Sequence, residues 1–310
     1  MNFLVVGPGA MGCLFAARLK KAGHGVTLLD YRPERVDHIN EHGIRVEGIT
    51  GEYEVRVPAV TGKSSEIPDV VLICVKANQT RKAAEDLAAW LGSEARVLTL
   101  QNGLGNLEIL EEILGKDRVL GGVTAEGATL LGRGHIRHAG QGDTIIGPEG
   151  PPDGPVWEIV SAFKEAGFNI RSAENVNDLI WGKLIVNVGI NALTAITRLK
   201  NGRLPNIEGT RLIMEEAVRE AMSVAHAKKI TLPYPDPQKR VTEVCLATAE
   251  NIASMLQDVL KQKITEVAFI NGAIVREGRE LDIPTPVNHT LTCLVQAIQE
   301  TYDGILTASP

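Results

Sequence analysis

The opening residues carry the pattern that most restricts what this chain can fold into. An apolar run over residues 2–6 leads directly into Gly7-Pro8-Gly9-Ala10-Met11-Gly12, which fits G-x-G-x-x-G and opens a helix expected over residues 10–22. Gly7 permits the tight turn out of the strand, Gly9 lets a pyrophosphate approach the backbone, and Gly12 lets the helix pack close to the sheet. The N–H groups at the helix start then favour phosphate. The pattern predicts a dinucleotide-binding turn in preference to a glycine-rich turn without a ligand.

Strand and helix patterns alternate from this turn to about residue 174. Apolar runs predict strands over residues 26–29, 70–75, 97–100 and 168–171, and helices are expected over 80–91, 106–114 and 156–166. Residues 44–57 read as a hairpin with its turn near residues 48–51. Repeated βα units imply an α/β fold, with a Rossmann-type, doubly wound and mostly parallel sheet over residues 1–174.

Beyond residue 174 the pattern changes to helical spacing. Residues 176–196, 207–228, 241–260 and 265–280 each repeat apolar residues at helical intervals, and residues 232–237 form a proline-rich loop. The sequence therefore predicts an all-helical C-terminal domain over residues 175–310 that carries the substrate and catalytic groups. A chain of 310 residues is long enough for two such domains.

Composition narrows the partners and the compartment. The net charge of -6 does not favour nucleic acid or an anionic membrane as a partner. No run reaches about 18 apolar residues, so we expect no membrane span, and a strand expected to start at residue 2 leaves no room for a signal peptide. We expect a cytoplasmic protein.

Four cysteines occur, and none forms a C-x-x-C pair. Each lies in an apolar stretch, so we expect reduced, buried thiols and no metal site; the four are Cys13, Cys74, Cys245 and Cys293.

The end of the second strand carries two conflicting signals about the cofactor. Asp30 lies where a carboxylate would bind the ribose 2′-hydroxyl of NAD, whereas Arg32 and Arg35 lie where guanidinium groups could hold the 2′-phosphate of NADP. Arg35 could equally belong to a solvated helix face. The sequence alone leaves the choice of dinucleotide open.

The segment 181–193 is apolar almost all round, which predicts a buried helix, yet it contains three polar residues. Lys183, Asn187 and Asn191 lie at i, i+4 and i+8, within roughly 80° of one another on a helix. A buried lysine or amide without partners is costly, so this stripe needs water, a ligand or other polar groups opposite it. It is either a structural polar network or a catalytic site, in which Lys183 would protonate a carbonyl oxygen and the amides would orient the substrate.

Motifs spread across the whole chain resemble those of the ketopantoate reductase (2-dehydropantoate 2-reductase) family. Besides the glycine turn they are Val75-Lys76-Ala77, Gln101-Asn102-Gly103-Leu104-Gly105, Trp181-Gly182-Lys183-Leu184, Asn191-Ala192-Leu193-Thr194-Ala195, residues 250–258 and residues 265–272. They occur in the family's order, so their combination is far more specific than any one of them.

The resemblance implies reduction of ketopantoate to pantoate by NADPH, a step toward pantothenate and coenzyme A. It implies Lys183 as the general acid and Glu266 as the group that positions Lys183 and contacts the ligands. It further implies substrate contacts from Asn102, Asn187, Asn191, Asn201 and Ser254, and a nicotinamide end of the cofactor site lined by Lys76, Asn102 and Ala128.

One departure from the family pattern concerns the cofactor. Where this chain has Tyr31, the family usually has an arginine that is associated with the 2′-phosphate, and Arg32 stands one position later. We therefore expect NADPH, with Arg32 in the cofactor site and NADH as the alternative.

Two other functions stay open from the residues alone. One is a related 2-keto acid or hydroxyacid dehydrogenase that uses NADH or NADPH; the other is a non-catalytic dinucleotide sensor, because fold does not determine function. A sensor has no need of a proton donor such as Lys183. Either a monomer or a homodimer is compatible with the sequence.

Overall fold

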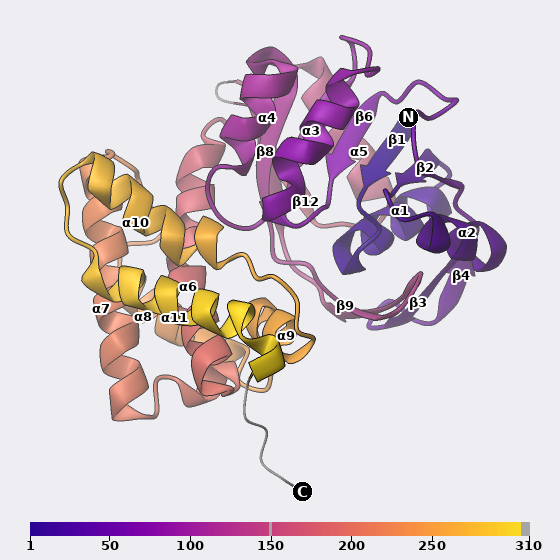
Figure 1. The fold of residues 1–310 in the computed structure, drawn as a ribbon. Coiled ribbons are helices and arrows are strands. Elements are labelled where there is room, and N and C mark those ends of the chain that lie inside the picture. Colours follow the sequence, from indigo (N-terminus) through magenta and orange to yellow (C-terminus); the bar gives the residue numbers. More distant parts are fainter. Residues whose placement is uncertain (149–150, 305–310) are drawn as a thin grey trace, which may run out of the picture. The chain divides into compact units, whose positions relative to one another are not determined.

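The computed structural model describes residues 1–148 and 151–304. The described residues form two compact units, one of residues 1–101, 106–148 and 151–176 and one of residues 102–105 and 177–304 (Figure 1). The dinucleotide turn lies in the first unit and the polar helix stripe in the second.

The first unit is built from strands and helices in alternation. The strands are β1 (Asn2–Val6), β2 (Gly25–Leu29), β3 (Ile44–Gly48), β4 (Tyr53–Val55), β5 (Ala59–Val60), β6 (Val70–Ile73), β7 (Arg96–Thr99), β8 (Val119–Thr124), β9 (Gly127–Gly132), β10 (His135–Gly140), β11 (Thr144–Gly147) and β12 (Ile170–Ser172). The helices are α1 (Ala10–Lys21), α2 (Pro33–His42), α3 (Thr80–Ala88), α4 (Asn106–Leu114) and α5 (Gly154–Glu165), with short 3-10 turns at Ala77–Gln79 and Lys116–Arg118.

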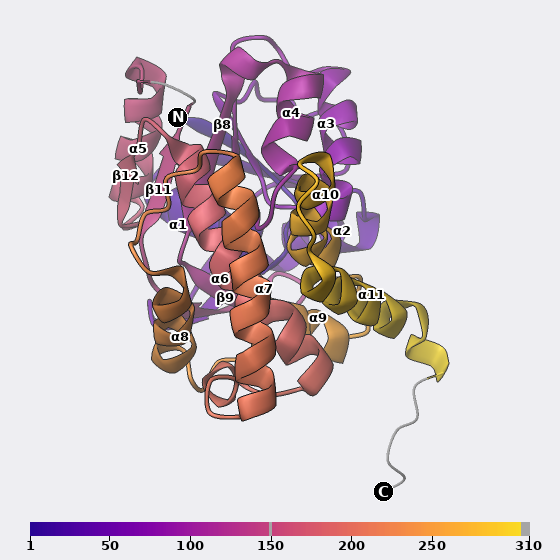
Figure 2. The same ribbon diagram turned by 90° about the vertical axis from the view of Figure 1, so that its left-hand side faces the viewer.

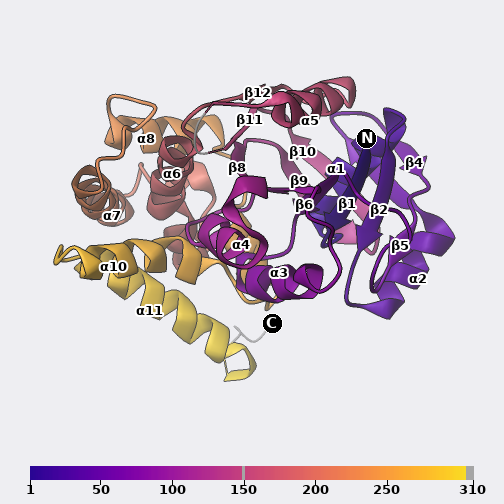
Figure 3. The same cartoon turned by 90° about the horizontal axis from the view of Figure 1, so that it is seen from above.

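The larger sheet has the strand order β12-β11-β8-β7-β6-β1-β2-β5. The pairs from β8 through β7, β6, β1 and β2 to β5 are all parallel, and β11 runs antiparallel to β8. Figure 3 shows α2 beside β5 at the end of this sheet. The predicted α/β class with a mostly parallel sheet is confirmed.

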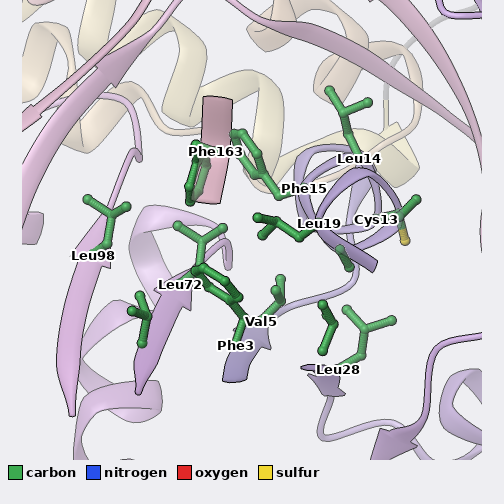
Figure 4. Close-up of a cluster of buried hydrophobic side chains, with 14 of the residues drawn as sticks. Phe3, Val5, Cys13, Leu14, Phe15, Leu19, Leu28, Leu72, Leu98 and Phe163 are labelled. Atoms are coloured by element: carbon green, nitrogen blue, oxygen red, sulfur yellow. The ribbon is translucent and has the colours of Figure 1, made fainter. Parts of the chain in front are cut away.

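Strand β1 shows why the sheet is parallel and covered on both faces. Its side chains alternate between two hydrophobic clusters, with Phe3 and Val5 on one face and Leu4 and Val6 on the other. A strand that is apolar on both faces must be buried on both, as in βαβ folds. Figure 4 shows the first cluster, in which Phe3 and Val5 lie near Phe15 of α1 and Phe163 of α5. Helices α3 and α4 pack side by side on the other face.

The smaller sheet, β4-β3-β10-β9, packs against α1, which also contacts β1 and β2 of the larger sheet. The predicted hairpin is confirmed, because β3 pairs antiparallel with β4. Its inward residues Ile44 and Val46, with Ile136 of β10, join the cluster that contains α1. Helix α1 is thus held between two sheets, and its N-terminal end stays fixed relative to β1.

The second unit is helical. Its elements are α6 (Val176–Thr197), α7 (Glu208–Ala227), α8 (Pro237–Ala247), α9 (Ser254–Leu260), α10 (Asn271–Glu280) and α11 (Pro286–Glu300), with 3-10 turns at Asn201–Arg203, Val267–Phe269 and Tyr302–Gly304. Figure 2 shows α6 and α7 running alongside one another. They meet at Gly189, where an added Cβ would lie 3.0 Å from Val218 of α7 and 2.8 Å from Val241 of α8. Close helix packing at this glycine places α6 in the centre of the unit.

A buried polar network fixes the start of α11. The Glu220 carboxylate on α7 accepts the backbone N–H groups of Val287 at 2.8 Å and Asn288 at 2.9 Å. The Asn288 side chain in turn accepts a hydrogen bond from Asn271 of α10 at 2.9 Å. The carboxylate satisfies N–H groups that the first turn of α11 leaves without helical partners.

Two of the helices expected in this half differ from the structure. The helix predicted over residues 241–260 is wrong, because residues 248–253 interrupt it: the N–H groups of Asn201 and Gly202 bond the carbonyls of Asn251 and Ala249. The helix predicted over 265–280 begins only at Asn271, after a 3-10 turn. Helix α11 lies in a segment for which no element was predicted.

Helix α6 meets the length and composition of a membrane span, the one helix among the described residues that does so. The mean hydropathy of its most apolar 18-residue window is 1.6, and 67% of that window is buried inside the protein, as in the core helix of a globular unit. Among the cysteines, burial raises the pKa of Cys13 to about 12 and that of Cys245 to about 11. Cys293 is exposed, so the expectation that all four thiols are buried was wrong.

Candidate active site

The glycine turn has the geometry that its sequence predicts. Gly7 has φ +95, and an added Cβ would lie 2.8 Å from Cγ1 of Val75. A Cβ on Gly12 would lie 2.2 Å from the Gly7 carbonyl oxygen. The turn is held by the Gly7 N–H, which donates to the Leu29 carbonyl at 2.9 Å. Only glycine fits at both positions.

Gly9 differs from its two neighbours in the motif. An added Cβ there would meet no atom within 4 Å, so the backbone faces unfilled space. Gly9 is also the N-cap residue of α1, and no side chain caps the helix start. Unshielded N–H groups at a helix N-terminus beside such a space suit a pyrophosphate. Met11 and Ala10 follow in the first turn, and Pro8 is buried beneath the loop.

The residues after β2 separate into an inner and an outer pair. The Asp30 side chain is 3% exposed and lies 2.9 Å from Nε of Arg35, and Arg35 also donates to the Pro8 carbonyl at 3.3 Å. Burial raises the pKa of Asp30, and Arg35 opposes that rise. Outside this pair, Nε of Arg32 donates to the Tyr31 hydroxyl at 2.8 Å, and Tyr31 is 59% exposed. The exposed cation here is Arg32.

A polar network occupies the carboxyl ends of β6 and β7, the edge at which ligands bind in this class of fold. Lys76 is half-buried and begins the 3-10 turn after β6. The Gln101 amide donates to the Val75 carbonyl at 2.7 Å and to the Thr80 hydroxyl at 2.9 Å. The Thr80 hydroxyl donates to Asn106 at 2.8 Å. This network fixes the backbone on either side of Lys76.

Ala128 lies on β9, paired with His138 of β10, and is partly buried against the first hydrophobic cluster. The neighbouring residue Glu126 is buried and bonds His138 at 2.7 Å. Ala128 is therefore on a well-anchored strand.

The three predicted polar residues of α6 lie on one buried helix. Trp181 and Leu184 flank Lys183 and are buried, and Asn191 is 5% exposed. The Nδ2 of Asn187 is buried and has no hydrogen-bond partner among the described residues. An unsatisfied buried donor lowers the stability of the fold, so an acceptor from a ligand or a water is expected at Asn187 Nδ2.

Lys183 is half-buried, and desolvation lowers its pKa to about 8, against the opposing effect of the Glu266 carboxylate. Glu266 is 7% exposed and stands immediately before the 3-10 turn Val267–Phe269. A lysine with its pKa near neutrality can release and regain a proton at working pH. The structure thus brings Glu266, predicted to position Lys183, close enough to Lys183 to affect its pKa.

Asn102 belongs to a loop that is anchored on the same segment as Glu266. The Leu104 N–H donates to the Phe269 carbonyl at 2.9 Å, and an added Cβ on Gly103, which has φ +88, would lie 2.3 Å from that oxygen. The close approach requires glycine at position 103. Asn102 is therefore held near the turn that carries Glu266.

Asn201 and Ser254 lie on a separate pair of segments. The Asn201 amide donates to the Thr248 hydroxyl at 2.9 Å, while its Oδ1 is buried without a hydrogen-bond partner among the described residues. Ser254 is exposed and opens α9, directly after the interruption that Asn201 stabilises. A role for these two residues stays a prediction.

Sequence reasoning missed one contact beside Lys183. The Tyr234 hydroxyl donates to the Gly182 carbonyl at 2.7 Å, and an added Cβ on Gly182 would lie 2.7 Å from the Pro233 ring. The proline-rich loop thus packs directly on the first turns of α6. The only sequence signal was the glycine before Lys183.

Known protein families match both units of the chain. The family model "Ketopantoate reductase PanE/ApbA" matches residues 3–150, and its C-terminal counterpart matches residues 175–299. The chain is 37% identical to the 2-dehydropantoate 2-reductase of Halobacterium salinarum, over 96% of this chain and 99% of that protein.

Two solved structures are similar over nearly the whole chain. The PanE/ApbA family ketopantoate reductase of Ralstonia eutropha is 34% identical with a TM-score of 0.91, over 98% of this chain and 100% of that one. The ternary structure of D-mandelate dehydrogenase with NADH and anilino(oxo)acetate is 28% identical with a TM-score of 0.90, over 98% and 100%. With both family models matched in order and full-length relatives above 30% identity, this chain is an oxidoreductase that belongs to the ketopantoate reductase PanE/ApbA family.

Proposed function

We propose that this protein reduces ketopantoate to pantoate with NADPH, as a 2-dehydropantoate 2-reductase. The observation that carries the proposal is Lys183, an amine on a buried helix whose pKa is lowered to about 8 beside the Glu266 carboxylate. The choice of substrate is supported by the 37% identical relative, whose name is 2-dehydropantoate 2-reductase.

Each residue has a chemical task in this reaction. A bound reduced nicotinamide supplies the hydride. The Lys183 ammonium donates a proton to the oxygen of the 2-keto group as that oxygen becomes an alcohol. Glu266 raises the pKa of Lys183 against desolvation and so keeps more of it protonated at neutral pH. Asn187, with its unsatisfied donor, and Asn191 bind and orient the 2-keto acid.

Most of the residues that we assign to the cofactor belong to the first unit. Gly7, Gly9 and Gly12 form the pyrophosphate turn, and the unfilled space at Gly9 fits the group. Arg32 is the exposed cation for a 2′-phosphate, and Lys76 and Ala128 line the nicotinamide end. Asn102 completes that end and contacts the substrate. NADPH is the expected cofactor, with NADH as the alternative.

The experiment is reductase activity of the purified protein with ketopantoate and a panel of other branched 2-keto acids. We expect ketopantoate to be clearly the best substrate, and Lys183→Ala to lower turnover by about 10² or more while NADPH still binds. Unchanged turnover in that variant would refute the role of Lys183. No oxidation of NADPH at high protein concentration with any 2-keto acid would favour a dinucleotide sensor.

A second candidate is a 2-hydroxyacid dehydrogenase related to D-mandelate dehydrogenase. It is favoured by one observation, the TM-score of 0.90 to that protein in complex with NADH. Faster turnover of an aromatic 2-keto acid with NADH than of ketopantoate with NADPH would decide for it.

We further infer a cytoplasmic protein that needs neither nucleic acid nor membrane for activity. Light scattering of the purified chain would distinguish the monomer from the homodimer.

A further inference from the structure

The position of Asp30 at the end of β2 is normally a signal for NADH. In Rossmann folds a carboxylate at that point bonds the ribose hydroxyls of NAD, and a free negative charge there opposes the 2′-phosphate of NADP. The same site in this chain is expected to take NADPH. Asp30 must therefore be bound differently from the usual ribose ligand.

The structure turns the Asp30 carboxylate inward. Its side chain is only 3% exposed, and the backbone of Tyr31 and Arg32 together with Arg35 opposes the rise that burial causes in its pKa. A carboxylate so buried cannot bond a ribose at the surface without leaving this environment. Its Oδ2 has no hydrogen-bond partner among the described residues. A positive charge must therefore compensate for the desolvation of this atom.

Arg35 supplies that charge. Its Nε lies 2.9 Å from Asp30 Oδ2, and its Nη1 donates to the Pro8 carbonyl at 3.3 Å. Arg35 sits in the first turn of α2, so it connects the end of β2, the glycine turn and α2. With two of its nitrogens directed inward and a side chain only 19% exposed, it is poorly placed to bind a phosphate at the surface.

Arg32 and Tyr31 lie outside this pair. Among the Arg32 nitrogens, Nε donates a hydrogen bond to the Tyr31 hydroxyl. The guanidinium carbon of Arg32 lies 5.0 Å from the centroid of the Tyr31 ring. Within the described ranges, the terminal nitrogens of Arg32 have no hydrogen-bond partner in the protein. A stacked guanidinium with free terminal nitrogens suits a phosphate.

We propose that Arg35 determines the cofactor preference of this protein indirectly, by neutralising Asp30, so that a dinucleotide with a 2′-phosphate is accepted at Arg32. Arg35 is a specificity-determining residue that acts through Asp30 and makes no bond to the cofactor. This inference rests on the proposed function insofar as NADPH occupies the glycine turn.

The test is a set of dissociation constants for NADPH and NADH without substrate, from nucleotide fluorescence and calorimetry. The proteins are the unsubstituted chain, Arg35→Met, Asp30→Asn and the double variant. Arg35→Met should weaken NADPH binding by about tenfold or more, equal to about 1.4 kcal/mol, and NADH binding by less than about threefold. The double variant should regain NADPH affinity to within about threefold of the unsubstituted chain.

The double variant separates neutralisation from direct phosphate binding. If Arg35 bonded the phosphate itself, removing the Asp30 charge would not restore NADPH affinity, and the proposal would be overturned. Asp30→Asn alone keeps Arg35 and removes no packing, so it remains informative if Arg35→Met unfolds. It should leave NADH affinity within about threefold, whereas a tenfold loss of NADH would identify Asp30 as a ribose ligand and refute the proposal.

Arg32→Met is the positive control, since it should weaken NADPH binding whether or not Asp30 is replaced. Failure of the proposed function is distinguishable from failure of this inference. If the affinities of the single and double variants change as predicted and ketopantoate is not reduced, only the proposed function fails. If the unsubstituted chain binds NADPH and the double variant does not recover, only this inference fails.

Discussion

The lowered pKa of Lys183 makes a quantitative prediction about the pH dependence of reduction. In the proposed mechanism the ammonium form of Lys183 is the proton donor, so kcat/KM for the 2-keto acid should be highest below a pKa of about 8 and fall as pH rises through it. A group with a pKa of about 8 is about nine-tenths protonated at pH 7 and about one-tenth protonated at pH 9. The expected loss between those two values is therefore about tenfold. Oxidation of the hydroxy acid needs the neutral amine and should rise over the same range.

Glu266 tests the cause of this pKa. Its carboxylate raises the pKa of Lys183 against desolvation, so Glu266→Gln should move the fall of kcat/KM to lower pH. Loss of a merely structural carboxylate would lower the rate at every pH and leave the midpoint in place. The midpoint, and not the size of the rate, is the informative quantity.

The assay is the loss of NADPH absorbance at saturating NADPH across the pH range. Lys82→Ala is the matched control, because Lys82 is an exposed lysine that pairs with Asp86 on the surface of α3, and its removal should leave the profile unchanged. Lys183→Ala should remove the pH dependence, and added primary amines should restore part of the rate according to their own pKa values. A flat profile from pH 7 to pH 9 in the unsubstituted protein would refute the assignment of Lys183.

Four further variants, one of them with a matched control, test the site and the fold around it. Gly9→Ala should keep the melting temperature and weaken NADPH binding by about tenfold or more, because its methyl group enters the phosphate space, whereas Gly12→Ala should lower the melting temperature, since its Cβ would lie 2.2 Å from a carbonyl oxygen. Equal melting temperatures would contradict this contrast. Glu220→Gln should lower the free energy of unfolding in urea by about 1–3 kcal/mol through loss of charged hydrogen bonds at α11, with exposed Glu216→Gln on the same helix unchanged. Asn187→Ala should raise KM for ketopantoate by about tenfold with an unchanged dissociation constant for NADPH, and a KM that stays the same would exclude Asn187 from the substrate site.

Elements whose cause is local could be predicted from the sequence. The glycine turn, β1 and α1 follow from backbone sterics and apolar spacing over a dozen residues, and α4 begins and ends at the predicted residues. The polar stripe of Lys183, Asn187 and Asn191 could also be predicted, because a polar residue at every fourth position of an apolar helix is a local pattern.

Elements that depend on distant contacts could not be predicted. The apolar spacing of residues 241–260 continues through the interruption at 248–253, and only the backbone bonds from Asn201 and Gly202 explain why the helix stops there. The late start of α10 has a similar origin, because the Phe269 carbonyl accepts from Leu104. In both cases the partner is more than 40 residues away along the chain, so no window of local sequence contains the cause.

The same distinction explains the conflict over the cofactor. By position along the chain Asp30 indicates NADH, and Arg32 and Arg35 indicate NADPH; position cannot say which side chains face the ligand. The first turn of α2 places Arg35 beneath the strand end, where it pairs with Asp30 and bonds Pro8, and leaves Arg32 outside with Tyr31. In three dimensions Asp30, the signal for NAD, and Arg35, one of the signals for NADP, form an internal ion pair. Under the proposed assignment, the chain keeps an aspartate at the position typical of NADH enzymes and accepts the 2′-phosphate at Arg32, provided that Arg35 remains the partner of Asp30.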